Sequence, residues 1–138
     1  MQNTRLIMYH KDSYSARLRF LKLAYGGVCG FTPMPRLAQI VEPNEPEKVV
    51  THPAHLLKEA EDYLGTKGIL EAEGEFRVVV DVPNGPIQVF LARFTAIDPP
   101  FMAAEKCAAE FIELPQAINL PQVELDLLRE VYTLVIGG

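Results

Sequence analysis

The sequence is poor in cysteine and in positive charge, and each shortage excludes a class of protein. The chain has 138 residues and two cysteines, Cys29 and Cys107, whose separation matches no metal-binding or redox spacing. We therefore expect a reduced, cytoplasmic protein. Lys and Arg number 13 against 18 Asp and Glu, a net charge of -5, whereas a nucleic-acid binder needs clustered cations to neutralise phosphates. The one basic cluster, Arg17, Arg19 and Lys22, is typical of a solvated face.

Long apolar runs are also missing. The apolar run near the N-terminus is too short for a signal peptide, and no stretch approaches the roughly eighteen residues that a spanning helix needs. We therefore expect no contact with a membrane. Hydrophobic residues make up 49% of the chain and charged residues 22%, a globular composition. Its length suits a single domain, which we place at residues 1–138.

Apolar periodicity and turn residues predict an α+β fold in which an antiparallel three-stranded meander, about 68–97, is extended by short N-terminal strands and packed by about four helices. We expect the N-terminal strands at 5–9 and 37–41. Ser13 is expected to cap the first helix and Gly65 to end the second. The expected helices cover 13–25, 52–64, 98–115 and a last segment that begins near 119.

The clearest local signal is a β-hairpin over residues 75–97. Asn84 and Gly85 tolerate the positive φ angles of a type I′ turn, and the flanking runs are rich in β-branched and aromatic residues. Counting outward from this turn pairs Val82 with Ile87 and Val78 with Leu91 on one face. The same face then carries Arg93 at its end.

Arg93 has two interpretations. A guanidinium beside an apolar wall suits a carboxylate or phosphate ligand. Equally, it is a strand-end side chain that pairs with an internal carboxylate such as Glu71 or Glu105. An anion-accepting pocket between the hairpin and the first helix would also use Tyr14, in that helix, and His10, at the end of the first strand.

A weaker pattern is a His and carboxylate flank on the second expected helix, at helical spacing. Such side chains can share a divalent ion, but the spacing differs from the strong helical zinc motif. We expect no metal and no cofactor. No nucleophile stands beside an identifiable base, so catalytic residues remain unassigned. The residues of this flank are His52, His55, Glu59 and Asp62.

Surplus apolar surface supports the leading hypothesis, a small non-catalytic accessory domain that works by protein association. The last helix carries apolar side chains over more than half of its circumference, which is more than one packing face needs. We expect Leu128, Tyr132 and Val135 to meet a partner, including a second copy of the chain. The alternative is a small-ligand-binding protein or enzyme around Arg93, Tyr14 and His10.

Overall fold

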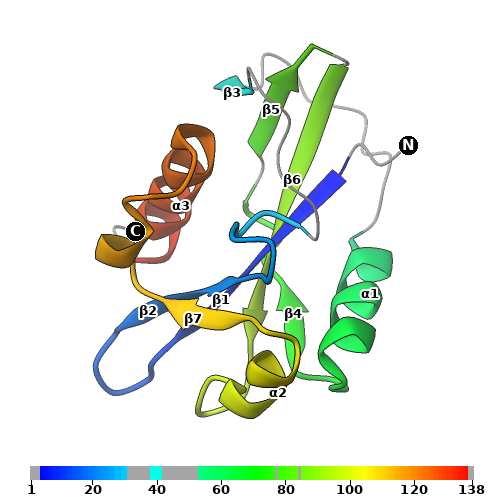
Figure 1. Ribbon diagram of the computed structural model, residues 1–138. Helices are drawn as coiled ribbons and strands as arrows, with labels where there is room; N and C mark the ends of the chain where they lie inside the picture. Colours follow the sequence, from blue (N-terminus) through cyan, green and yellow to red (C-terminus); the bar gives the residue numbers. More distant parts are fainter. Residues whose placement is uncertain (1–3, 31–37, 42–52, 77, 84, 137–138) are drawn as a thin grey trace.

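The protein is a mixed β-sheet with helices on both faces, seen in a computed structural model (Figure 1). The structure describes residues 4–30, 38–41, 53–76, 78–83 and 85–136. No helix in those ranges is long and apolar enough to cross a membrane. The strands are β1 Thr4–Lys11, β2 Leu18–Lys22, β3 Gln39–Val41, β4 Leu70–Ala72, β5 Val78–Val82, β6 Gly85–Phe94 and β7 Glu110–Ile112. The helices are α1 Ala54–Leu64, α2 Phe101–Lys106 and α3 Gln122–Val135, with a 3₁₀ turn, η1, at Leu114–Ala117.

The sheet runs in the order β3-β5-β6-β1-β2-β7, and β4 also pairs with β6. The α+β class is confirmed, but the three-stranded meander with four helices is wrong. Strand β6 is long enough to pair with β5 through its first half and with β4 through its second half. Its other edge pairs in parallel with β1. The meander prediction failed because turn signals locate strands without saying which strand lies alongside which.

The hairpin is present, with its register two residues away from the prediction. Val82 pairs with Gly85 and Val80 with Ile87, so the two linking residues are Pro83 and Asn84. A proline's fixed φ suits the first central position of a turn and not a primed turn. Because side chains alternate with a period of two, the shift leaves each residue on its predicted face. Asn84 itself lies outside the described residues.

The predicted helix over 13–25 is wrong. Asp12 starts a turn there, since its Oδ1 accepts the backbone N–H groups of Tyr14 at 2.8 Å and Ser15 at 3.0 Å. The chain then forms β2, which pairs antiparallel with the end of β1, Tyr9 opposite Phe20. This pairing, with that of β2 to the distant strand β7, overrides the helical spacing of the apolar residues.

The predicted helix over 98–115 ends much earlier than expected. Helix α2 stops at Lys106, and Ala108 takes a positive φ of 61°. A left-handed residue breaks a right-handed helix, and the chain continues as β7 against β2. The other helix predictions are confirmed within the described residues, including the helix stop at Gly65, whose φ is 75°.

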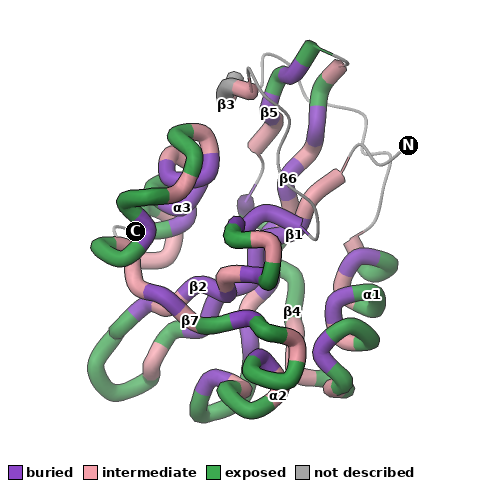
Figure 2. The backbone as a smooth tube through the Cα atoms, viewed as in Figure 1, coloured by how far each residue is buried: buried purple, intermediate pink, exposed green. Residues whose placement is uncertain are grey.

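Two hydrophobic cores result, one on each face of the sheet. The first joins α3 to the odd-numbered residues of β1 and β6, such as Ile7 and Leu91. The second joins α1 and α2 to the even-numbered ones, such as Met8 and Phe94. Figure 2 shows the buried residues along the central strands and on the inward sides of α1 and α3.

Candidate functional site

Arg93 is paired within the protein. Its Nη2 lies 2.6 Å from Oε1 of Glu71, the residue opposite it on β4. Both side chains are partly exposed, 42% and 60%, so water screens the pair. Of the two interpretations above, the structure supports the internal ion pair.

Tyr9 and Glu73 extend this pair into a small polar cluster. On β1, Tyr9 stands next to Arg93 in the register, and its hydroxyl donates to Oε2 of Glu73 at 2.5 Å. Burial, and then the hydrogen bond to Glu73, raise the pKa of the Tyr9 hydroxyl. The Arg93 cluster, meaning Tyr9, Glu71, Glu73 and Arg93, joins the ends of β1, β4 and β6.

His10 lies on the opposite face of the sheet from Arg93. Residues alternate along β1, so His10 follows Leu6 and Met8 into the second core, and it is 1% exposed. Its Nε2 donates to the carbonyl oxygens of Ala96 at 2.9 Å and Ile97 at 3.1 Å. Its Nδ1 is buried without a hydrogen-bond partner among the described residues. The imidazole therefore holds the backbone of the β6–α2 connection by these hydrogen bonds.

Tyr14 projects into solvent, 93% exposed, from the turn between β1 and β2. The Asp12 carboxylate accepts two backbone hydrogen bonds, and these lower its pKa. The bond from Ser15 has the larger effect, and the bond from Tyr14 the next. Arg93, His10 and Tyr14 thus lie in three different environments. Among the described residues they do not form one pocket.

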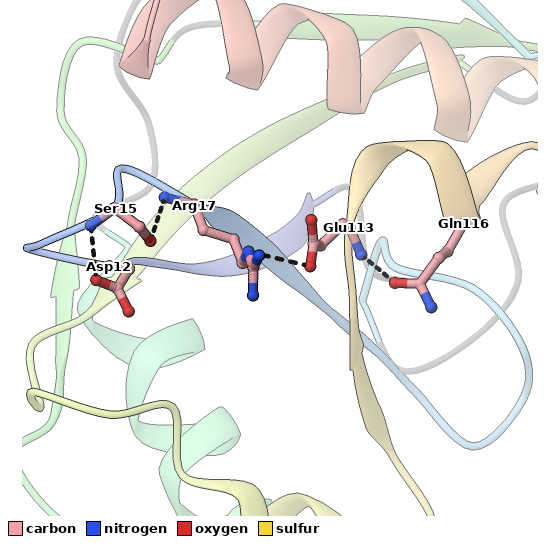
Figure 3. A network of polar contacts seen from close by, with 5 residues as sticks. All are labelled: Asp12, Ser15, Arg17, Glu113 and Gln116. Atoms are coloured by element: carbon pink, nitrogen blue, oxygen red, sulfur yellow. Dashed lines mark hydrogen bonds and ion pairs between the residues drawn. The ribbon is translucent and has the colours of Figure 1, made fainter.

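A network of polar contacts on the surface connects this turn to residues 113–116 (Figure 3). Ser15 accepts the N–H of Arg17 at 3.3 Å, and the Arg17 Nε lies 3.4 Å from Glu113 Oε2. Gln116 in turn accepts the N–H of Glu113 at 2.8 Å as half of a capping box. All of these groups are internally engaged, so the network is best explained as a structural contact between the turn before β2 and the N-cap of η1.

The polar side chains on the flank of α1 contact one another locally. His55 Nε2 lies 3.7 Å from Glu59, and Lys58 Nζ lies 3.2 Å from Asp62. His52 lies outside the described residues. Within the described ranges, no three His, Cys, Asp or Glu side chains are grouped as metal ligands.

The predicted partner residues on α3 divide between core and surface. Leu128 is 0% exposed and packs in the first core, so in this fold it is unavailable to a partner. Val135 is half-buried against the same core. Tyr132 is 43% exposed. The wide apolar arc of α3 is therefore mostly explained by contacts within the chain.

Two features escaped the sequence reasoning. The first is an apolar patch at the β6–α2 connection, formed by Ile97, Phe101 and Met102, which are 77%, 52% and 74% exposed. The guanidinium of Arg19 lies 5.8 Å from the Phe101 ring centroid. The signal in the sequence was the pair of prolines at 99 and 100, which is typical of a surface loop.

The second is a buried acid. Glu124, in the first turn of α3, is 1% exposed, and its Oε1 accepts the N–H of Val28 at 2.8 Å. Burial raises the pKa of this carboxyl, opposed by the bond from Val28. Burial also raises the pKa of the Cys29 thiol, and of the Tyr25 hydroxyl beside it, so Cys29 is a poor nucleophile. A glutamate within an otherwise apolar helical stripe was the signal available in the sequence.

Comparison with known proteins finds a similar fold. No protein-family model matches the chain, and no curated protein matches it. Among solved structures, the chain is similar to an Ap4A hydrolase from C. elegans, with a TM-score of 0.54 and 18% identity. The alignment covers 98% of this chain and 99% of the hydrolase. At that identity the likeness establishes a shared fold.

Proposed function

We propose that this chain is a small-ligand-binding protein whose ligand belongs to the nucleotide class. The observation that carries the proposal is the end-to-end match to the fold of an Ap4A hydrolase, 98% of one chain on 99% of the other. The match covers nearly all of both chains, so it compares whole folds and not one shared fragment. Because one fold hosts several activities, the proposal extends to binding and leaves hydrolysis as a separate measurement.

The proposed site excludes the Arg93 cluster. Arg93 is neutralised by Glu71, His10 is buried on the other face, and Tyr14 stands alone in solvent. A ligand phosphate at Arg93 would compete with the Glu71 carboxylate and would bring further negative charge beside Glu71 and Glu73. We therefore expect variants of Arg93 to bind as the wild type does.

A thermal-shift panel tests the proposal. The ligands are Ap4A and ATP, with adenosine and inorganic phosphate as controls for the base and for the anion alone. A ligand present at one hundred times its Kd should stabilise the fold by about 2.7 kcal/mol. Saturable stabilisation by Ap4A or ATP is expected, and an unchanged melting temperature with both would contradict the proposal. Chromatography of Ap4A after incubation then measures hydrolysis.

A second candidate function is self-association through the patch of Ile97, Phe101 and Met102. Three large apolar side chains exposed together at one connection favour a contact surface. A second copy would bury this patch against itself across a two-fold axis. Light scattering at micromolar concentration should then report a dimer, and Met102→Lys should convert it to a monomer. A monomeric wild type would remove this candidate.

A further inference from the structure

The glycine-rich segment 26–30 is packed between β1 and α3. It follows β2 and runs beside the first half of β1, where the Gly30 N–H donates to the Leu6 carbonyl at 2.9 Å. Strand β2 pairs only with the last residues of β1, so the segment takes the place of a neighbouring strand there. In Figure 1 it is the light-blue loop that crosses the middle of the molecule in front of β1 and β6.

Side chains from two directions hold this segment. Glu124 accepts the Val28 N–H at 2.8 Å. The Tyr25 hydroxyl lies 3.2 Å from both the N and the O of Cys29. Gly27 leaves no free space, since an added Cβ would stand 2.4 Å from the Tyr25 ring and 2.7 Å from Glu124 Oε1. The carboxyl group is therefore pressed directly against the backbone.

We propose that Glu124 is a proton-sensitive latch that fastens segment 26–30, closed when its carboxyl is protonated and loosened when it is ionised. The closed segment removes the carboxyl from water, which disfavours its charged form. Opening the segment returns the carboxyl to solvent. This proposal is independent of the proposed ligand.

The charged and titratable groups around the latch are few among the described residues. Tyr25 and Cys29 belong to the strand exit and the segment, and Arg5 comes from β1, where it reduces the upward pKa shifts of both. The hydrogen bond from the Val28 N–H favours the carboxylate, as do the N–H groups at the start of α3. Burial is the largest influence on Glu124 and raises its pKa.

The direction of the pH effect follows from linkage. A carboxyl whose pKa is higher in the closed state binds its proton more tightly there than in the open state. The closed state is then fully favoured below the ordinary carboxyl pKa of about 4.3. As pH rises from that value through the raised pKa, the open fraction should grow by up to about tenfold per pH unit.

Cys29 provides the measurement, because it is 0% exposed and adjoins the latch. In a Cys107→Ala background it is the remaining one of two cysteines. Its rate with 4,4′-dithiodipyridine, divided by the rate of the same chain unfolded in denaturant at the same pH, gives the open fraction. We expect this ratio to rise with pH in wild-type Glu124 and to be flat in Glu124→Gln. The surface variant Glu59→Gln is the matched control and should keep the rise.

A pH-independent ratio in the parent, or an equal slope in Glu124→Gln, would overturn the proposal. So would a reaction rate that rises with added denaturant as steeply as global unfolding does, because the segment would then not open on its own. If Glu124→Gln does not fold, hydrogen exchange of the Val28 amide, corrected for its intrinsic pH dependence, decides the question in the unmodified protein. Protection that decreases with pH over the same range supports the latch, and constant protection contradicts it.

Discussion

At the scale of single residues, Gly27 matters because of what touches it. A methyl group there would stand 2.4 Å from Tyr25 Cε1 and 2.7 Å from Glu124 Oε1. We expect Gly27→Ala to lower the free energy of unfolding by about 1 to 3 kcal/mol, through forced displacement of these side chains. Gly74→Ala is the matched control, since no atom beyond its chain neighbours lies within 4 Å of its added Cβ. Denaturant unfolding that gave the same loss for both would contradict the packing described here.

Arg93 shows how a sequence signal can be located correctly and still leave its role open. The predicted face holds, but the pairing with Glu71 depends on β4 lying beside β6, which the hairpin pattern did not contain. We expect Arg93→Ala to change stability by no more than about 1 kcal/mol, because both side chains are partly exposed. A double-mutant cycle with Glu71→Ala measures the coupling, and a value of several kcal/mol would contradict a screened surface pair.

At the scale of elements, Glu61 organises the connection from α1 to β4. Its carboxylate accepts the N–H groups of Gly68 at 2.8 Å, Ile69 at 2.7 Å and Leu70 at 3.0 Å. Glu61→Gln keeps the size but faces these donors with an NH₂ group, so we expect a loss of about 1 to 3 kcal/mol. Glu59→Gln, on the exposed flank of the same helix, should cost much less. Equal losses in thermal unfolding would show that Glu61 does not hold this loop.

The elements that the sequence predicted well are those whose signals are local. Helix α3 has a long apolar stripe, and α1 ends at a glycine with positive φ. Strand β2 was missed because its apolar residues also fit a helix, and its pairing with β7 is a long-range contact. The exposed apolar patch at the β6–α2 connection was missed because the helix there was predicted too long. The burial of Glu124 was missed because it depends on segment 26–30, which is distant in the sequence.

At the scale of the whole molecule, the apolar face of α3 mainly packs in the first core. Leu128 is fully buried, whereas Tyr132 is 43% exposed. We expect Leu128→Asp to destabilise the fold by more than about 4 kcal/mol, because it buries an unpaired charge. Tyr132→Asp should leave the fold intact. Circular dichroism measures folding and light scattering measures the oligomeric state. A Leu128→Asp variant that stays folded, but is monomeric where the wild type is oligomeric, would support a partner interface on α3 instead.

The central claim is that this fold binds a nucleotide-class ligand without using the Arg93 cluster. Titration calorimetry of Ap4A into the wild type and into Arg93→Ala tests it most directly. The account predicts saturable binding with one site per chain in both proteins and Kd values that agree within about threefold, a difference of about 0.65 kcal/mol. Absence of binding to the folded wild type at millimolar Ap4A, or binding that Arg93→Ala abolishes, would contradict it.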